Sequence, residues 1–388
     1  MFTLKKQSEI SKARRGQLHT THGMIETPCF MPIATKGAVR SLSSGDLDRL
    51  GVQIVLANTY HLLCRPGLEA MRERGGLHRW MRWDRPMLTD SGGYQVFSLA
   101  KRSRATENGV TFQSHIDGAR IELTPERSIA MQQVIGSDIM MQMDVVLSPD
   151  ADANVVRGAM EQSVRWAKRC KVYLDSHRGD SVTQNQKLFG IVQGGVDEAL
   201  RQESVDGLIK MDLDGYAIGG LSVGQSREDN FRVAALVADK LPQNKPRYFM
   251  GGGMPEEIIA YVKMGIDMFD CVIPTRHARH GSLFVFLDRP MDSHRDVIAS
   301  STKQSHQSLI DDFFYQTLNI TNAEHAAADI PVDSTCDCTL CTQFTRSYLH
   351  HLFDMNEILG MRLATEHNVR FYMRLMDGLR DAIENSQI

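Results

Sequence analysis

Short apolar runs recur along the chain, and most of them end in a polar or glycine-rich segment. Each run is rich in Val, Ile and Phe and is apolar over a few residues, which is typical of strands buried on both faces of a parallel sheet. Eight such runs are present, at residues 26–33, 52–61, 86–93, 138–144, 188–195, 215–221, 247–253 and 268–275.

Apolar residues at helical spacing lie between most of these runs. One helix has a clear start, because Thr124 is a capping residue and Pro125 suits the first helical position. Further helices are predicted over residues 154–174, 197–210, 227–241 and 254–265. The repeated alternation of strand and helix predicts an α/β fold, and favours a (β/α)8 barrel over an open doubly wound sheet. No G-x-G-x-x-G follows the first run, which argues against a dinucleotide-binding fold.

In a barrel of this kind the chemistry takes place where the strands end. Six of the runs end in polar, glycine or sulfur-containing residues: Asp90, Asp144, Gln193, Gly219-Gly220, Met250-Gly251 and Asp270. We therefore expect these residues to surround one mouth of the barrel.

The pattern changes after Phe286. Residues 287–334 are polar and irregular, and they lead into a cluster of cysteines followed by two helix-like stretches. We predict a catalytic barrel over residues 1–286, a linker with a small zinc-binding subdomain over 287–370, and a C-terminal helix over 371–388 that packs on the barrel.

The composition of the 388 residues, 42% apolar and 23% charged, is that of a globular protein. There is no apolar run long enough to cross a membrane and no apolar segment of a secretory signal near the start. We expect a cytoplasmic protein without a membrane partner. The net charge of −3 gives no general attraction to nucleic acid, so any RNA contact requires basic residues gathered on one face.

Three of the seven cysteines fall within six residues: Cys336, Cys338 and Cys341. In a cytosolic chain this spacing favours a metal over disulfides, and a tetrahedral zinc ion needs a fourth ligand. The candidates are His350, His351 and His367. The first two lie in an apolar helical stretch, whereas the third is expected at a helix start, from which it can turn back to the cysteines. Four protein ligands would make the zinc structural.

Two carboxylates are expected on opposite sides of the mouth. Asp90 is followed by Ser91-Gly92-Gly93-Tyr94, and Asp270 lies between apolar neighbours, where an idle carboxylate would be costly to bury. Two such groups can act as a nucleophile and a proton shuttle. The alternative is that each is a helix cap or a loop charge.

Asp144 and Gln193 offer the acceptors and donors that read the edge of a purine. The backbone of Gly219-Gly220-Leu221 can add an N–H and a carbonyl, and Tyr94 and Met250 can cover the two faces of a flat ring. Taken alone, Tyr94 and Met250 fit core residues better than ring-stacking residues.

A local group of cations follows Asp270 in residues 274–281: Arg276, His277, Arg279 and His280. It is either a phosphate contact or a solvated loop.

These segments together closely resemble the tRNA-guanine transglycosylases, also called queuine tRNA-ribosyltransferases. The resemblance rests on "LTDSGGYQVFSL", "GIVQGG", "GYAIGGLSVG", "RYFMGGG", "GIDMFDCVIPTRHAR" and C-x-C-x2-C with a later histidine. It covers roughly residues 10–285 and 318–385.

The resemblance implies an irregular (β/α)8 barrel with one structural Zn2+ per chain, in a homodimer. It implies that guanine at the wobble position of tRNAs with GUN anticodons (Asp, Asn, His, Tyr) is exchanged for a 7-deazaguanine, in queuosine synthesis. By resemblance Asp270 is the nucleophile that holds the tRNA covalently, and Asp90 is the general acid and base. Double displacement then predicts retention at the anomeric carbon and needs no organic cofactor.

Further site residues follow from the same resemblance. The base-binding residues would be Asp90, Ser91, Gly92, Gly93, Tyr94, Asp144, Gln193, Gly219, Gly220, Leu221 and Met250. The RNA-binding residues would be Gly251, Gly252, Gly253, Met254, Pro255, Glu256, Glu257, Thr275, Arg276, His277, Ala278 and Arg279. The zinc ligands would be Cys336, Cys338, Cys341 and His367.

The chain departs from the bacterial pattern at Val146, where a cysteine is typical, and at Gln225, where a glutamate is typical. The pocket is thus of mixed type, and the incoming base is either preQ1, which the overall bacterial character favours, or queuine. The segment 287–316 is longer than the usual link to the zinc subdomain.

Two other functions compete with this reading. A non-catalytic RNA-binding subunit of a heteromeric transglycosylase would lack the acid and the nucleophile, both of which are present here. A barrel hydrolase that cleaves nucleosides would admit water to the covalent intermediate and would need no RNA surface.

Overall fold

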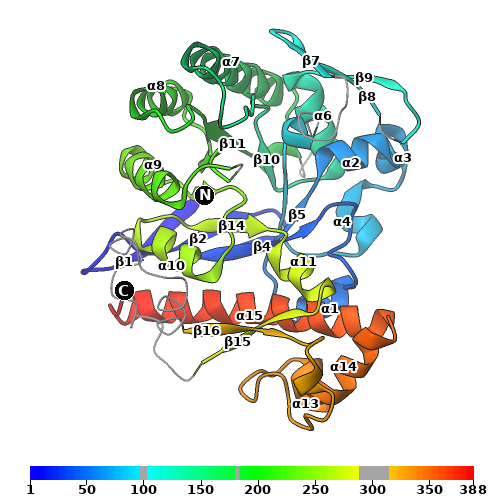
Figure 1. Ribbon diagram of the computed structural model, residues 1–388. Coiled ribbons are helices and arrows are strands. Elements are labelled where there is room, and N and C mark those ends of the chain that lie inside the picture. The colour runs from blue at the N-terminus through cyan, green and yellow to red at the C-terminus, as the bar shows by residue number, and fades with distance from the viewer. Residues whose placement is uncertain (96–102, 115, 180–182, 223, 288–313) are drawn as a thin grey trace.

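The computed structural model describes the chain except for residues 96–102, 115, 180–182, 223 and 288–313 (Figure 1). Most of the long segment 287–316 therefore lies outside the described residues.

Eight parallel strands close into a barrel in the order β10, β11, β12, β13, β14, β4, β5, β6 (Figure 1). Each of the eight apolar runs coincides with one of them to within one residue at its ends or contains it, so the predicted barrel is confirmed. The strands are β4 (Cys29–Ala34), β5 (Val55–Ala57), β6 (Met87–Thr89), β10 (Ile139–Met141), β11 (Lys187–Val192), β12 (Gly215–Ile218), β13 (Arg247–Phe249) and β14 (Met268–Cys271).

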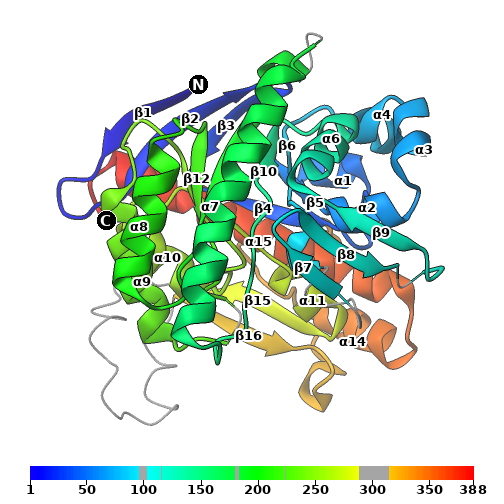
Figure 2. The ribbon, with the colours of Figure 1, turned by 90° about the horizontal axis from the view of Figure 1, so that it is seen from above.

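Helices surround the barrel, and the five predicted from the sequence all form (Figures 1 and 2). These are α6 (Pro125–Ile135), α7 (Ala153–Ser176), α8 (Glu198–Ile209), α9 (Arg227–Lys240) and α10 (Pro255–Lys263). The side chain of Thr124 accepts a hydrogen bond from the backbone N–H of Arg127, as expected of the cap. Shorter helices are α1 (Ser44–Arg49), α2 (Thr59–Cys64), α3 (Leu68–Glu73), α4 (Gly76–Met81) and α11 (Ile273–Arg279). Among the described residues, no helix has both the length and the apolarity needed to cross a membrane.

The barrel strands are buried on both faces, which explains their apolar runs. In β11, Phe189 and Ile191 face the barrel interior, whereas Leu188 and Val192 join the core between the barrel and its helices. The other strands alternate in the same way, because successive side chains of a strand point to opposite faces.

An antiparallel sheet of β1 (Phe2–Gln7), β2 (Arg14–Thr20) and β3 (Gly23–Thr27) covers the end of the barrel where the strands begin. Its Phe2, Leu18 and Ile25 pack with the interior side chains of the barrel. Arg14 of this sheet forms a buried ion pair with Asp267, which precedes β14. With this end closed, only the opposite end of the barrel is left for a site.

Two additions make the barrel irregular. A sheet of β7 (Ser103–Thr106), β8 (Gly109–Gln113) and β9 (Arg120–Leu123) lies between β6 and α6 in the sequence. After α11 the chain forms a hairpin of β15 (Ser282–Phe286) and β16 (Tyr315–Asn319). It ends with the 3-10 turn η2 (Ala323–His325) and with the helices α13 (Thr339–Gln343), α14 (Arg346–Asp354) and α15 (Ile358–Glu384), whereas the other 3-10 turn, η1 (Thr183–Asn185), lies just before β11.

The expectation that residues 287–334 are irregular is wrong for β16. This strand was missed because three of its five residues are exposed, so its sequence shows no apolar run. The expected domain limits fall between the paired strands β15 and β16 and inside α15, which crosses residue 370 without a break. The division into a barrel, a zinc subdomain and a C-terminal helix stays a proposal.

Candidate active site and metal centre

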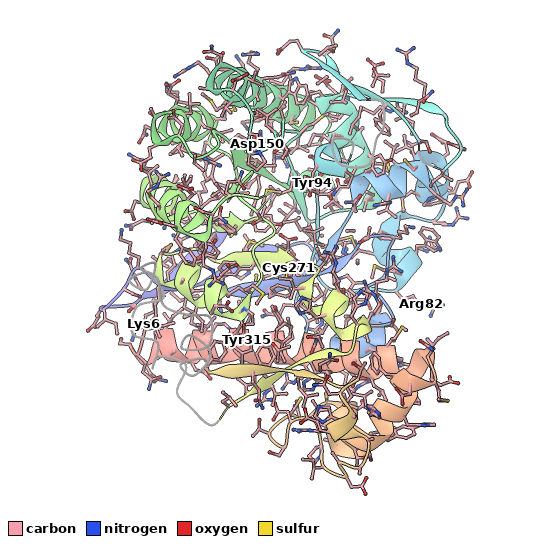
Figure 3. All side chains as sticks on the ribbon, in the orientation of Figure 1. Lys6, Arg82, Tyr94, Asp150, Cys271 and Tyr315 are labelled. Atoms are coloured by element: carbon pink, nitrogen blue, oxygen red, sulfur yellow. The ribbon has the colours of Figure 1, made fainter. Side chains whose placement is uncertain are left out.

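The inward-facing positions of the strands continue into the open mouth of the barrel. The residues two positions beyond the last inward-facing side chains are Thr35, Asn58, Asp90, Met250 and Asp270, and all of them line a cavity of about 460 Å3. Tyr94 and Cys271, which also line it, lie within the ring of helices in Figure 3. Asp144, Gly219, Gly220 and Gly251 line the same cavity, and Gln193 adjoins it through its hydrogen bond to Asp144, so the residues expected at the mouth do lie together.

Asp90 is held by uncharged donors. Its Oδ1 accepts hydrogen bonds from the backbone N–H groups of Thr59 at 2.9 Å and Gly92 at 3.2 Å, and its Oδ2 accepts one from Asn58 Nδ2. The pKa of Asp90 is raised to about 7. Burial is the main cause, and the nearby negative charge of Asp270 adds to the rise. A carboxyl group with this pKa can both give and take a proton near neutral pH.

Asp270 is buried in β14. The hydroxyl of Tyr248 and the backbone N–H of Gly251 both donate to its Oδ1, at 2.5 and 2.8 Å. Burial raises the pKa of Asp270 above its usual value, and these two hydrogen bonds oppose the rise. Oδ2 accepts no hydrogen bond from the described residues, so it is available to a ligand.

The turn after Asp90 requires glycine for two reasons. Gly92 has φ 82°, a conformation that other residues rarely adopt, and a Cβ there would lie 3.2 Å from the backbone nitrogen of Tyr60. A Cβ at Gly93 would lie 3.1 Å from the backbone oxygen of Asp144. The Ser91 hydroxyl accepts a hydrogen bond from the N–H of Gly93. The turn thus brings the loops after β6 and β10 together.

Asp144 and Gln193 are joined directly. Gln193 Nε2 donates to Asp144 Oδ2 at 2.7 Å, and both side chains are buried. Burial raises the pKa of Asp144 to about 6. The pair presents a carboxylate and an amide side by side, as predicted for reading the edge of a purine.

The glycines after β12 pack against the amide of Gln193. A Cβ at Gly219 would lie 2.9 Å from Gln193 Nε2, and one at Gly220 would lie 2.4 Å from Gln193 Oε1. Tyr94 and Met250 line the cavity, where Tyr94 is 46% exposed. The side chain of Leu221 is buried in the core outside the barrel, so only its backbone could contact a base.

The residues expected to bind RNA divide into exposed and buried ones. Several are buried: Gly252, Gly253, Pro255, Glu256, Thr275 and Ala278. Glu256 and Glu257 are paired with Arg227 of α9, at 2.7 and 2.8 Å. The residues that reach the surface or lie partly exposed are Gly251, Met254, Glu257, Arg276, His277 and Arg279.

Three of the four cationic residues after Asp270 lie in the helix α11 and not in a loop, and the fourth, His280, directly follows this helix. Arg276 is exposed beside the cavity. The pKa of Arg279 is lowered by burial and by the positive charges of Arg40 and Arg276, so these three guanidinium groups lie near one another. Arg40, on the segment after β4, was not predicted from the sequence to belong to this group.

The candidate metal ligands form one cluster. The sulfur atoms of Cys336, Cys338 and Cys341 and a ring nitrogen of His367 all lie within 4.8 Å of one another. His367 Nδ1 is 3.3 Å from the sulfur of Cys341, while its Nε2 is 2.7 Å from the backbone oxygen of Phe284. A proton on Nε2 satisfies that oxygen and leaves the Nδ1 lone pair for a metal, which is the usual arrangement of a ligating histidine. The four residues fit a metal ion.

The other two histidines lie elsewhere. His350 Nδ1 is 2.7 Å from the backbone oxygen of Ile320, and His351 is exposed. His367 is not at a helix start, as the sequence suggested, but inside α15. That helix begins nine residues earlier, at Ile358, because the break occurs at Asn356, which has φ 54°.

Two groups that orient the carboxylates, Asn58 and Tyr248, were not predicted from the sequence. Asn58 directly follows β5 inside the second apolar run, at an inward-facing position, so the alternation of the strand could have revealed it. Tyr248 lies inside an apolar run and is therefore expected to be a core aromatic residue. Nothing in the neighbouring sequence indicates that its hydroxyl binds Asp270.

Asp270→Asn is expected to stabilise the folded protein at pH 8 by about 0.5–2 kcal/mol. The folded pKa of Asp270 is raised, so its contribution to stability is fully present below the unfolded pKa and is lost as pH rises through the folded pKa. Asparagine does not titrate and can keep both bonds to Oδ1. Urea unfolding at pH 4 and pH 8 measures this: the variant should gain stability over the wild type only at pH 8. An equal difference at both pH values would contradict the burial effect.

The chain matches known proteins over nearly its whole length. Residues 8–388 match the protein family described as Queuine tRNA-ribosyltransferase. A protein of that name from Pseudoalteromonas atlantica is 46% identical over 377 residues, which are 97% of this chain and 92% of that protein. One from Acinetobacter baylyi is 44% identical over 380 residues, 98% of this chain and 90% of that protein. The resemblance inferred from the motifs is confirmed, and the chain belongs to the queuine tRNA-ribosyltransferase family.

Proposed function

We propose that this protein is a tRNA-guanine transglycosylase of queuosine synthesis, which exchanges guanine at the wobble position of tRNA for a 7-deazaguanine. The observation that carries the proposal is the cavity itself. Asp90 and Asp270 line it together with Asp144, and the last is bonded to Gln193. Two carboxylates serve the chemistry and the third, with the amide, serves recognition of the base. Its substrates would be the GUN-anticodon tRNAs for Asp, Asn, His and Tyr, in the cytoplasm.

The first half-reaction would use both catalytic carboxylates. Oδ2 of ionised Asp270 attacks C1′ of the wobble nucleotide, the bond from C1′ to N9 of guanine breaks, and Asp90 gives its proton to the departing base. Tyr248 and Gly251 hold Oδ1 of the nucleophile, so that the other oxygen is directed by the same two bonds. The product is a ribosyl ester of Asp270 and free guanine.

The second half-reaction reverses these roles. Asp90 takes the N9 proton of the incoming base, N9 attacks C1′, and the carboxylate of Asp270 leaves. Two inversions give net retention. The pKa of about 7 at Asp90 suits a group that is an acid in one step and a base in the next.

Both bases would be held in the same way. Asp144 accepts from the ring N–H and the amino group, Gln193 and the backbone at Gly220 contact the carbonyl edge, and Tyr94 and Met250 cover the ring faces. Arg276 and Arg279, with the partly exposed His277, would contact the RNA backbone at the rim. A non-catalytic RNA-binding subunit is a weaker alternative, because both catalytic carboxylates are present in the cavity.

Base exchange tests the proposal. Wild-type protein is expected to incorporate labelled guanine into unfractionated tRNA. In Asp270→Ala the rate of incorporation should fall by at least about a thousandfold, because the nucleophile is removed. Asp239→Ala removes a surface carboxylate on α9 and should keep full activity. No incorporation by folded, metal-loaded wild type would favour the binding subunit. Release of guanine without incorporation of label would favour a nucleoside hydrolase.

Competition in the same assay identifies the incoming base. We propose preQ1, and expect it to suppress the label at lower concentration than queuine does. The reverse order would assign the enzyme to salvage of queuine, consistent with the departures at Val146 and Gln225.

We propose further that the Cys336, Cys338, Cys341 and His367 cluster holds one structural zinc ion per chain. Three thiolates and an imidazole are a typical zinc set, and four protein ligands leave no place for a reacting water. Zinc, when bound, would supply folding energy, which is about 10–16 kcal/mol in zinc-finger peptides.

Metal analysis of the purified protein checks the zinc site. The wild type should contain one zinc per chain, and His367→Ala should lose it and unfold at lower temperature. His351→Ala, at an exposed histidine of α14, should keep both the metal and the melting temperature. Retention of zinc by His367→Ala would contradict the assignment.

A homodimer is proposed from the resemblance and from an exposed apolar patch. In this patch, Met355, Ile358 and Leu359 lie between the end of α14 and the start of α15, and Tyr348 lies two turns before Met355 on α14; Ile358 is 76% exposed. Apolar patches of this kind often mark protein interfaces.

Sedimentation velocity should give twice the chain mass of 43.6 kDa for the wild type. Ile358→Arg should shift the protein to the monomer, because it places a charge in the patch. Val172→Arg changes an equally apolar residue, 60% exposed on the distant helix α7, and should leave the dimer intact. A monomeric wild type, or the same response of both variants, would contradict the proposed interface.

A further inference from the structure

A fully buried arginine lies behind the ends of β11 and β12. Arg201 is in the first turns of α8, which packs between α7 and α9 (Figures 1 and 2). Its Nη1 donates to the backbone oxygens of Val192 at 2.6 Å and Gly219 at 2.8 Å, and its Nε donates to that of Gly195 at 2.8 Å. One guanidinium group thus binds both strand ends and the loop after β11.

The position of this charge is energetically unfavourable. Among the described residues Arg201 has no ion pair, and burial lowers its pKa to about 9, so it remains charged at neutral pH. Its Nη2 is buried and has no partner among those residues. An apolar side chain of similar volume would fill the space at lower cost. What Arg201 adds, compared with an apolar side chain, is therefore its three hydrogen bonds to backbone carbonyl oxygens.

Each of the two strand-end carbonyls directly precedes a residue that faces the base. Val192 precedes Gln193, and Gly219 precedes Gly220. The same two strand ends are bonded to each other, because the N–H of Gly219 donates to the oxygen of Val192 at 3.1 Å. Arg201 binds both oxygens and so fixes the last rung between the strands.

A second residue of α8 acts on the same segment. Ser204, one helical turn after Arg201, is buried and accepts a hydrogen bond from the N–H of Gln193 at 3.2 Å. Residues three apart lie on the same face of a helix, so this face of α8 holds the backbone on both sides of the peptide between Val192 and Gln193.

Small displacements at this point would be felt by a bound base. Gly220 lies so close to Gln193 that a Cβ would be 2.4 Å from its Oε1, and the amide also donates to Asp144. A shift of either strand end changes the spacing of all three groups, and hydrogen bonds weaken steeply as their geometry worsens.

We propose that Arg201, assisted by Ser204, is a positioning residue for base recognition: it sets the distance between Gln193 and Gly220 by clamping the carbonyls that precede them. The inference rests on the proposed role of Gln193 and Gly220 in holding the base. Arg201 touches neither the base nor the ribose.

Steady-state exchange of labelled guanine, with tRNA and guanine varied in turn, tests the clamp. Arg201→Met is expected to raise KM for guanine about tenfold, as for the loss of one well-placed hydrogen bond, and to leave KM for tRNA within about twofold. Arg201→Lys keeps a buried cation and should restore part of the loss. Ser204→Ala should raise KM for guanine about threefold.

Arg157→Met is the matched control. Arg157 lies on α7 and pairs with Glu203 of α8 at the surface, so its loss also removes an arginine contact to this helix. It should leave both KM values unchanged. A merely structural role of Arg201 would lower the melting temperature and the active fraction without changing KM for guanine in the folded enzyme. If Arg201→Met does not fold, Arg201→Lys and Ser204→Ala carry the test.

Gln193→Ala separates failure of the clamp from failure of the proposed function. This variant should itself raise KM for guanine, and adding Arg201→Lys to it should raise KM little further, since both act on one contact. If Gln193→Ala raises KM but Arg201→Lys and Ser204→Ala do not, the clamp is overturned and the recognition role stands. If Gln193→Ala leaves KM unchanged, the recognition role fails and the clamp with it.

Discussion

The site depends on one geometric constraint, the alternation of side chains along the strands of a closed barrel. Inward positions are filled by apolar side chains where the barrel is packed, and the next inward position beyond the packed layer reaches the mouth. Leu88 is followed in this way by Asp90, and Met268 by Asp270. Because the sheet of β1–β3 closes the other end, the inward-facing polar side chains at this end reach an open cavity. The candidate catalytic side chains thus occupy the next inward-facing positions after the packed side chains of the barrel interior.

The carboxylates at the two ends of the barrel are held differently. At the closed end, hydrogen bonds from His22 and His78 outweigh the effect of burial and hold the pKa of Asp138 well below its usual value. At the open end, Asp90 and Asp270 are bonded only by uncharged groups, so burial dominates and raises their pKa. The first arrangement stabilises the fold. The second keeps carboxylates poorly solvated and reactive, at a cost in stability that the rest of the barrel must offset.

The barrel could be predicted from the sequence because strands buried on both faces leave continuous apolar runs, and the residues that end them are visible in the chain. What remained hidden has a tertiary origin. From the sequence, Tyr248 is expected to be a core aromatic residue, but in the structure its hydroxyl donates to Asp270. Arg201 is expected on the surface of α8, but its guanidinium binds the backbone at two strand ends. The strand β16 has an exposed face and no apolar run, so only its pairing with β15 defines it. The domain limits, the roles of the site residues and the RNA surface are still predictions.

The helix α15 connects the metal centre to the mouth of the barrel. It carries His367, and two residues that follow His367 on the same helix bind segments that flank the candidate active site. Asn368 Nδ2 donates to the backbone oxygen of Pro274 at 3.0 Å, and the Tyr372 hydroxyl donates to that of Gly253 at 2.5 Å. Pro274 begins α11 with its arginines, and Gly253 lies in the loop after β13. A metal held by these four residues would fix His367 against the cysteine loop, and would thereby also fix the helix on which both proposed RNA-binding segments rest.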